Sequence, residues 1–269
     1  MVGSMLIEQM FGVERALIGV IHLDPLPGTP RATAVDQIVG RAAAEARLYA
    51  DAGFHGLVIE NMGDRPYLRG TVGPEVVAAM TAATVAVRSA VDLPLGVQVL
   101  AGANREALSV GLAAGASFVR VEGFVFAHVA DEGIIESDAG ELLRYRRAIG
   151  ADQIAIFADI KKKHSSHALT EDVDLADTAE AAEFFLADGV VVTGTATGRP
   201  TAAVDVAVVA DRVSIPVLVG SGVNPGNVAR YRRADAIIVG SFVKREGIWS
   251  NALDPDRLSA MAAAFAATG

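Results

Sequence analysis

The segment Gln153–Lys161 carries a carboxylate and an amine in a pattern that could do acid–base or covalent chemistry. Its apolar run predicts a buried strand, on which Phe157, Asp159 and Lys161 share the inner face. A lysine beside a carboxylate can transfer protons, form a Schiff base or bind an anion, with Asp159 orienting it. A structural ion pair is the alternative, because buried charges are costly unless they pair.

Polar side chains also end four other predicted strands, and Glu60 rather than its neighbour Asn61 is expected to face inward. Each residue alone could belong to a satisfied polar layer, but five such strand ends together favour a site. The candidate catalytic residues are Lys161, Asp159, Glu60, Glu122 and His22, and the candidate substrate-binding residues of these strands and their loops are Gln98, Arg120, Lys163, His164 and Asp24.

Glycines and serines end the last two predicted strands and favour a phosphate site. Glycine lets backbone N–H groups approach an anion, and a following helix start would add a favourable dipole. Tight turns are the alternative explanation for the same glycines. The candidates are Gly220, Ser221, Gly222, Gly240 and Ser241, and the run from Thr193 through Thr195 and Thr197 adds hydroxyl groups that could bind the same ligand.

Two further features concern the loops at this end of the strands. The proline-rich segment Pro25–Arg31 leaves the first strand, so Arg31 either reaches an anionic ligand or is solvated.

A metal could be held by a set drawn from His22, Asp24, Glu60, Glu122, Asp159 and His164. Because no short metal-binding signature is present, we predict no cofactor and keep a divalent metal as an option.

The elements that would position these residues alternate along the chain, strand first. Strands are predicted at Ala16–Leu23, Gly56–Asn61, Pro94–Leu100, Phe118–Glu122, Gln153–Lys161, Gly189–Thr195, Pro216–Ser221 and Ala236–Ser241. Helices are predicted at Val35–Ala52, Pro74–Val91, Arg105–Ala114, Asp138–Ile149, Asp174–Ala187, Ala203–Val213, Pro225–Arg233 and Pro255–Ala267. Two open sheets are the alternative, but the pattern favours one α/β domain over residues 1–269, a (β/α)₈ barrel whose first strand begins near residue 16.

Loop lengths support the barrel independently. Helix-to-strand connections are short, whereas strand-to-helix connections such as Met62–Gly73 and Gly123–Ser137 are long and polar. In a barrel the long connections all lie at the carboxyl ends of the strands, which is where barrel enzymes carry their active sites. The sequence therefore predicts that the candidate residues meet at one end.

Composition excludes several classes of protein. With 52% hydrophobic and 20% charged residues, the chain can bury a core and is not disordered. The absence of cysteine excludes disulfides and thiolate chemistry, and the net charge of −9 argues against nucleic-acid binding. We expect no signal peptide, no membrane span and a cytoplasmic location. A homo-oligomer is also expected, because helices such as Pro255–Ala267 are rich in small apolar residues.

Four segments together resemble a known family, the BtpA/SgcQ family. They are Gly19-Val-Ile-His-Leu-Asp-Pro-Leu-Pro-Gly-Thr-Pro-Arg, Gly56-Leu-Val-Ile-Glu-Asn-Met-Gly-Asp-Arg-Pro-Tyr, Ala158-Asp-Ile-Lys-Lys-Lys-His and Val219-Gly-Ser-Gly-Val-Asn-Pro-Gly-Asn. The resemblance implies a ribulose-phosphate-type barrel; photosynthetic members are associated with photosystem I biogenesis and the SgcQ branch with sugar-phosphate gene neighbourhoods. The family pattern has an apolar residue between two lysines, so the run Lys161–Lys163 leaves open which lysine faces the ligand.

The sequence thus favours an enzyme that acts on a small phosphorylated metabolite, a sugar phosphate or a nucleotide-like compound. Isomerase, epimerase, lyase and aldolase chemistry remain open. A non-catalytic photosystem I biogenesis factor and a metal-dependent hydrolase are the alternatives.

Overall fold

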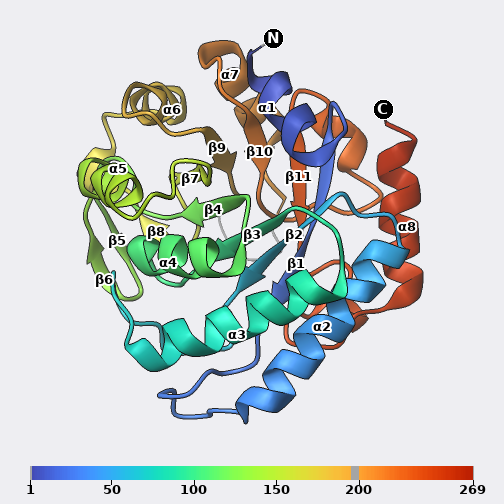
Figure 1. Cartoon of the computed structure of the whole chain (residues 1–269). Helices are drawn as coiled ribbons and strands as arrows, with labels where there is room; N and C mark the ends of the chain where they lie inside the picture. The colour runs from blue at the N-terminus through green and yellow to red at the C-terminus, as the bar shows by residue number, and fades with distance from the viewer. Residues whose placement is uncertain (1, 195–199, 269) are drawn as a thin grey trace.

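The computed structural model describes residues 2–194 and 200–268, and eight parallel strands within them close into a barrel (Figure 1). The strand order around the barrel is β1-β11-β10-β9-β7-β4-β3-β2. The strands are β1 (Ala16–His22), β2 (Gly56–Glu60), β3 (Leu95–Gln98), β4 (Phe118–Val121), β7 (Ala155–Ile160), β9 (Gly189–Val192), β10 (Val217–Val219) and β11 (Ala236–Val239). The predicted barrel is confirmed.

Helices surround the barrel at the predicted places except one. They are α2 (Val35–Asp51), α3 (Pro74–Ala90), α4 (Asn104–Ala114), α5 (Ala139–Ala148), α6 (Leu175–Phe184), α7 (Ala203–Arg212) and α8 (Pro255–Ala266). The helix predicted at Pro225–Arg233 is wrong, since only the 3-10 turn η2 (Val228–Tyr231) forms. The Asn227 side chain accepts a hydrogen bond from the Asn224 N–H, and such local bonds compete with helix formation.

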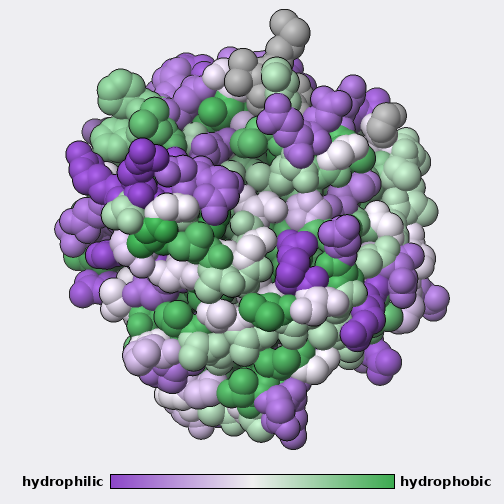
Figure 2. Space-filling model, in the orientation of Figure 1, coloured by the Kyte–Doolittle hydropathy of each residue, from purple (hydrophilic) through white to green (hydrophobic). Residues whose placement is uncertain are grey.

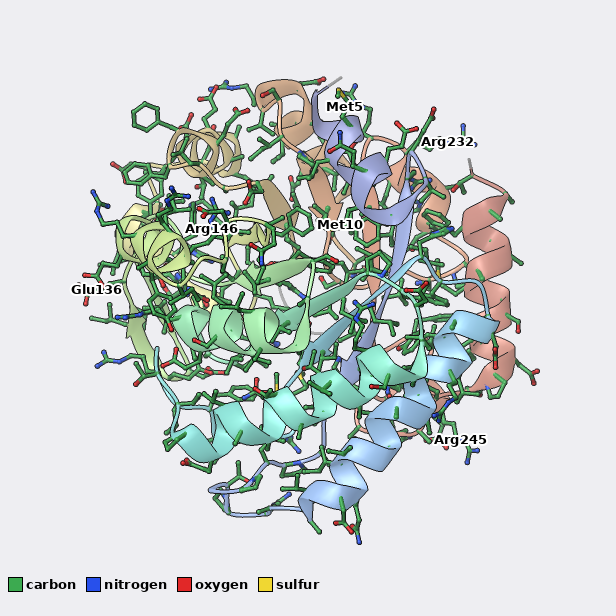
Figure 3. The ribbon with its side chains drawn as sticks, in the orientation of Figure 1. Met5, Met10, Glu136, Arg146, Arg232 and Arg245 are labelled. Carbon is green, nitrogen blue, oxygen red and sulfur yellow. The ribbon has the colours of Figure 1, made fainter. Side chains whose placement is uncertain are left out.

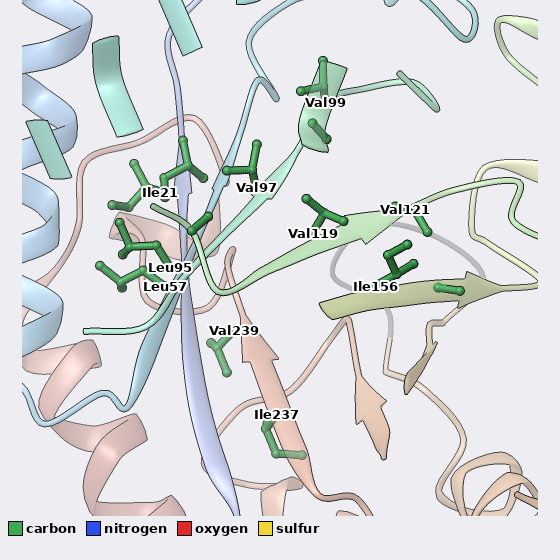
Figure 4. Close-up of a cluster of buried hydrophobic side chains, with 14 of the residues drawn as sticks. Ile21, Leu57, Leu95, Val97, Val99, Val119, Val121, Ile156, Ile237 and Val239 are labelled. Carbon is green, nitrogen blue, oxygen red and sulfur yellow. The ribbon is translucent and has the colours of Figure 1, made fainter. Parts of the chain in front are cut away.

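The main apolar core lies between the barrel and its helices (Figure 4). Ile21, Val97, Val119 and Val239 point outward from their strands into this layer. Their neighbours along each strand point inward, because successive side chains of a strand alternate between its faces. The alternation leaves the inward positions available for a second core and for the site.

Aromatic rings fill the interior of the barrel on the side where the strands begin. The rings of Phe118 and Phe157 lie 5.1 Å apart. A Cβ added at Gly96 would lie 2.2 Å from the Phe118 ring, and one at Gly189 would lie 2.8 Å from Phe157. The two glycines therefore make the room that these rings occupy.

A helix that the sequence analysis missed, α1 (Val2–Phe11), closes this same end of the barrel (Figure 1). Ile7 and Phe11 are buried among the inward side chains, and the Phe11 ring meets Phe118 edge-on at 5.9 Å. Met10 packs against this cluster, whereas Met5 is exposed (Figure 3). The spacing of Ile7 and Phe11, one helical turn apart, was the available signal.

Three short strands cover part of the other end. The loop after β4 folds into β5 (His128–Ala130) and β6 (Gly133–Ile135), and β5 also pairs with β8 (Ser165–Ser166) in the loop after β7. Two 3-10 turns follow, η1 (Ala168–Thr170) and η3 (Arg245–Gly247). The small sheet ties the loops after β4 and β7 together.

The helices and the surface of the structure bear on the expected absence of a membrane span and on the expected homo-oligomer. None of the helices in the described ranges has the length and apolarity needed to cross a bilayer. Exposed apolar side chains gather at the end of α6, at Phe184, Phe185 and Leu186 (Figure 2), rather than on α8. The homo-oligomer stays a prediction, which light scattering would check.

Replacement Phe11→Ala should lower the free energy of unfolding by about 3–5 kcal/mol, because it removes a buried ring and leaves a cavity. Urea unfolding followed by circular dichroism measures the change. Met5→Ala in the same helix is the control: Met5 is 56% exposed and Phe11 only 8%, and surface changes usually stay within about 0.5 kcal/mol. Equal losses in the two variants would show that α1 does not seal the barrel.

Candidate active site

The predicted polar strand ends do converge at the carboxyl end of the barrel. In the strand register, His22 on β1 is paired with Glu60 on β2, which is paired with Gln98 on β3. All three are buried, as are Arg120 on β4, Glu122 just after β4 and Asp159 on β7. One inward polar layer therefore lies above the apolar interior.

Arg120 is the centre of this layer. Its Nε and Nη2 donate to the two carboxylate oxygens of Asp159, each at 3.1 Å, and its Nη1 donates to Glu60 at 3.2 Å. A guanidinium suits this arrangement, because its planar fork of donors matches a carboxylate in two places. Asp159 thus pairs with Arg120 rather than with a lysine of its own strand.

Burial and pairing act in opposite directions on these groups. Burial raises the pKa of Glu60 and of Asp159, and the charge of Arg120 partly offsets this for both carboxylates. Burial alone would lower the pKa of Arg120, but Asp159 and Glu60 outweigh it, so the pKa of Arg120 is raised. Arg120 therefore stays charged, and the two carboxyl groups are more basic than exposed ones.

A second buried ion pair flanks the first. Lys162 donates to Glu122 at 2.8 Å, and the amide nitrogen of Gln98 donates to the other Glu122 oxygen at 3.3 Å. Burial acts to lower the pKa of Lys162, yet Glu122 raises it overall. Lys162 is thus a charged structural partner of Glu122.

The three consecutive lysines point in different directions. The expectation that Lys161 shares the interior with Asp159 is wrong: its backbone turns to a φ of 43° and its Nζ donates to the carbonyl of Thr170 at 3.1 Å. Lys163 instead faces the cavities at the barrel mouth. Within the described parts of the chain, Lys163 Nζ has no hydrogen bond and no ion pair.

The environment of Lys163 favours the neutral amine. Burial lowers its pKa and the nearby charge of Arg120 lowers it further, while Glu60 and Asp159 act in the opposite direction. A lysine whose pKa is lowered holds more neutral amine at neutral pH, and the neutral amine is the nucleophile and the base. Lys163 therefore takes the place that the strand pattern assigned to Lys161.

His22 is held as a neutral acceptor. Burial lowers its pKa to about 3, with a further contribution from Lys244. Its Nδ1 lies 3.2 Å from the carbonyl oxygen of Trp249, so Nδ1 carries the proton and donates. The Nε2 lone pair then faces Glu60, 3.9 Å away, and can accept a hydrogen bond from a ligand.

A cavity of about 210 Å³ brings the predicted phosphate residues to this layer. A Cβ at Gly220 would lie 2.6 Å from the Val191 side chain and 3.1 Å from Arg120 Nη2, so a side chain there would force a shift. One at Gly240 would lie 3.0 Å from the His22 ring, which is a tight contact. The walls shared with the site are His22, Glu60, Arg120, Lys163, Gly220, Ser221, Gly222, Gly240 and Ser241.

Sequence reasoning missed one cation on this wall, Arg257 in the first turn of α8. Its Nε donates to the carbonyl of Phe242 at 2.7 Å, and its guanidinium lies over the Phe242 ring at 4.6 Å. In the described ranges its terminal nitrogens have no carboxylate partner. No local pattern marked it, because it comes from the helix after the last strand.

A second cavity, of about 240 Å³, adjoins the first. Glu60, Met62, Arg120 and Lys163 line both, so they form the junction between the two. The remaining walls of the second cavity are Arg65, Tyr67, Gln98, Leu100, Ala101, Glu122, Asp131, Glu132, Lys162, His164 and Trp249. The predicted ligand residues Gln98 and His164 thus lie in the second cavity.

Other candidates lie apart from the cavities. Asp24 forms an ion pair with Arg41 at 2.7 Å, and Arg31 is exposed in its loop and lines neither cavity. Thr193 neighbours Gly220, and its Oγ1 is buried with no hydrogen-bond partner. The predicted hydroxyls of Thr195 and Thr197 lie outside the described residues.

The residues that the sequence offers as optional metal ligands do not assemble in the described parts of the chain. Over residues 2–194 and 200–268, no three histidine, aspartate or glutamate side chains gather as metal ligands. The carboxylates of the layer are instead paired with cations, Glu60 and Asp159 with Arg120 and Glu122 with Lys162. Asp24 and His164, two members of that set, are also not on a common wall.

Solved structures with the same fold include thiamine phosphate pyrophosphorylase from Pyrococcus furiosus and phosphoribosyl anthranilate isomerase from Thermus thermophilus. The first is 12% identical with a TM-score of 0.58, covering 98% of each chain. The second is 14% identical with a TM-score of 0.58, covering 94% of this chain and 100% of the other. At this identity the likeness shows the barrel fold alone.

Sequence comparison is more specific. A Caenorhabditis elegans protein named "Uncharacterized protein F13E9.13, mitochondrial" is 43% identical over 96% of each chain. The Synechocystis "Photosystem I biogenesis protein BtpA" is 36% identical, covering 96% of this chain and 90% of the relative. The model of the BtpA family matches residues 13–267. The chain therefore belongs to the BtpA family.

Proposed function

We propose that this protein is an enzyme that acts on a small phosphorylated metabolite at the carboxyl end of its barrel. One observation carries the proposal: a single cavity joins the Gly-Ser segments after β10 and β11 to an unpaired guanidinium, Arg257, and to an unpaired amine, Lys163. An unpaired guanidinium beside close-packed backbone is what a phosphate group needs.

The phosphate is held at the Gly-Ser segments. Gly220, Gly222 and Gly240 let the backbone approach the anion, and Arg257 supplies charge that can bind two phosphate oxygens. A helix dipole contributes little here, because only the short turn η2 follows β10. The phosphate-binding loops of barrel enzymes commonly follow the last two strands, which agrees with this placement.

The reaction takes place at the junction of the two cavities, at Lys163. Its amine can remove a proton beside a carbonyl group or form a Schiff base with that carbonyl. The basic carboxylate Glu60 lies in the same cavity and can accept or return protons, and His22 Nε2 can accept a hydrogen bond from the ligand. Isomerase, epimerase, lyase and aldolase reactions all use these steps.

A biogenesis role is the second candidate, because a relative of 36% identity is named as a photosystem I biogenesis protein. The cavity that joins Arg257 and Lys163 to the Gly-Ser segments favours the enzyme. A biogenesis factor would keep its activity when the polar layer is changed, whereas an enzyme would not.

Replacement Arg257→Met should weaken the binding of inorganic phosphate about tenfold or more, because a hydrogen bond to a charged group contributes roughly 1.5–3 kcal/mol. Isothermal titration calorimetry measures the dissociation constant. Arg245→Met is the matched control, since Arg245 is exposed and lies on neither cavity wall (Figure 3). Phosphate binding unchanged in Arg257→Met, with the variant folded by circular dichroism, would contradict the phosphate site.

Lys163 should be the first lysine labelled by pyridoxal 5′-phosphate followed by borohydride, because this probe carries an aldehyde and a phosphate together. The chain has four lysines, at 161, 162, 163 and 244, so mass spectrometry can follow each. A lowered pKa makes the Lys163 amine react at a lower pH than an exposed lysine does. Excess inorganic phosphate should slow the labelling.

Variants of adjacent lysines provide the control for this labelling. Lys163→Met should lose the fast label, and Lys161→Met should keep it, because Lys161 is bonded to Thr170 away from the cavities. Label on Lys161 or Lys162 instead, or labelling that phosphate does not slow, would refute the role given to Lys163.

A further inference from the structure

The second cavity extends the site beyond the proposed phosphate position. It is similar in volume to the first, about 240 Å³ against 210 Å³, and the two meet at Glu60, Met62, Arg120 and Lys163. A phosphate group bound at the Gly-Ser segments would leave this second space to the rest of the ligand. The chemistry of its walls then indicates what that part of the ligand must be.

The two cavities differ in charge. Glu60 is the single carboxylate on the described walls of the first, and it is paired with Arg120. The second adds three carboxylates, Glu122, Asp131 and Glu132, and two cations, Arg65 and Lys162. Within the described ranges neither Asp131 nor Glu132 has a hydrogen bond or an ion pair. A phosphate is favoured in the first cavity, where Arg120 and Arg257 face a single carboxylate, so an elongated ligand binds in one direction only.

The second cavity also offers acceptors without donors. The amide nitrogen of Gln98 donates to Glu122, but its carbonyl oxygen accepts no hydrogen bond from the described residues. Glu132 Oε2 is buried and has no hydrogen-bond partner. Buried polar atoms left unpaired are costly, so a bound group that donates hydrogen bonds would satisfy them.

Tertiary structure holds these groups in place from two sides. Glu132 lies in the turn between β5 and β6, and β5 pairs with β8 just after Lys163. On the opposite side Trp249 contacts His22 edge-on at 5.9 Å and carries the Arg65 guanidinium over its ring at 4.8 Å. The acceptors and the reacting amine are thus fixed relative to each other by the small sheet.

We infer that the substrate has two parts, a phosphate at one end and a head group rich in hydroxyl or amino donors at the other, which binds beside Glu132, Gln98 and Trp249. The inference rests on the proposed function and extends it to the substrate class. The atom that reacts lies between the two parts, next to Lys163. A compound with a phosphate and a short apolar chain would leave the hydrogen-bond acceptors of the second cavity without donors.

Trp249 is the single tryptophan of the chain and lines the second cavity, so its fluorescence reports filling of that cavity. The probes are inorganic phosphate, glycerol 3-phosphate, ribose 5-phosphate and adenosine 5′-monophosphate. All four should compete for the phosphate site in a thermal-shift assay. Ribose 5-phosphate or the nucleotide should also change the Trp249 emission, and which of them does so separates hydroxyl donors from amino donors.

Replacement Glu132→Gln should weaken the responding two-part probe about tenfold and leave the affinity for inorganic phosphate unchanged. Glu136→Gln is the matched control, an exposed carboxylate just after β6 that lines neither cavity (Figure 3). Trp249→Phe should remove the signal and keep phosphate binding, which assigns the emission change to this residue.

The outcomes separate the two proposals. If inorganic phosphate binds but no two-part probe binds more tightly or changes the emission, the two-part substrate is wrong and the phosphate site stands. An equal loss of affinity in Glu132→Gln and Glu136→Gln also overturns the head-group assignment. If no phosphorylated probe binds at all, the proposed function fails, and this inference fails with it.

Discussion

The buried ion pairs of Arg120 hold the polar layer of the candidate site together. Arg120 binds Asp159 through two nitrogens and Glu60 through a third, all buried at the end of the barrel. Leaving one of these charges without its partner would cost about 3–5 kcal/mol, which is a large part of the stability of a typical protein. Because Arg120 occupies both carboxylates, Lys163 is left without a counter-ion and its amine is available to a ligand.

The apolar half of the barrel allows such a polar layer to exist. Phe118 and Phe157 fill the interior where the strands begin, and α1 closes it with Phe11. Hydrophobic burial at that end stabilises the fold without help from the charged layer. The charged layer then lies at the end of the barrel that the strand-to-helix loops form. These loops can vary in length and sequence while the barrel below them stays the same.

The division of the site into two cavities comes from how the charges pair. Glu60 is paired with Arg120 at the junction, and Glu122 is paired with Lys162 on the wall of the second cavity. Among the described charged groups without an ion pair, Lys163 lies at the junction, Arg257 lines the first cavity, and Arg65 and Glu132 line the second. This polarity orients a ligand by charge before any close contact is made. A ligand with a phosphate at only one end suits it.

The barrel could be predicted from the sequence, because alternating strands and helices with long loops after the strands leave few other folds. The inward-pointing residues could be predicted as far as Asp159, since strand alternation is strict. Beyond the strand ends that rule stops: Lys161 turns away at a positive φ, and Lys163 lines the cavities instead. This difference comes from the tertiary fold, which also brings Arg257, Glu132 and Trp249 to the site. These residues come from different loops and from the last helix, so their meeting depends on how those segments pack.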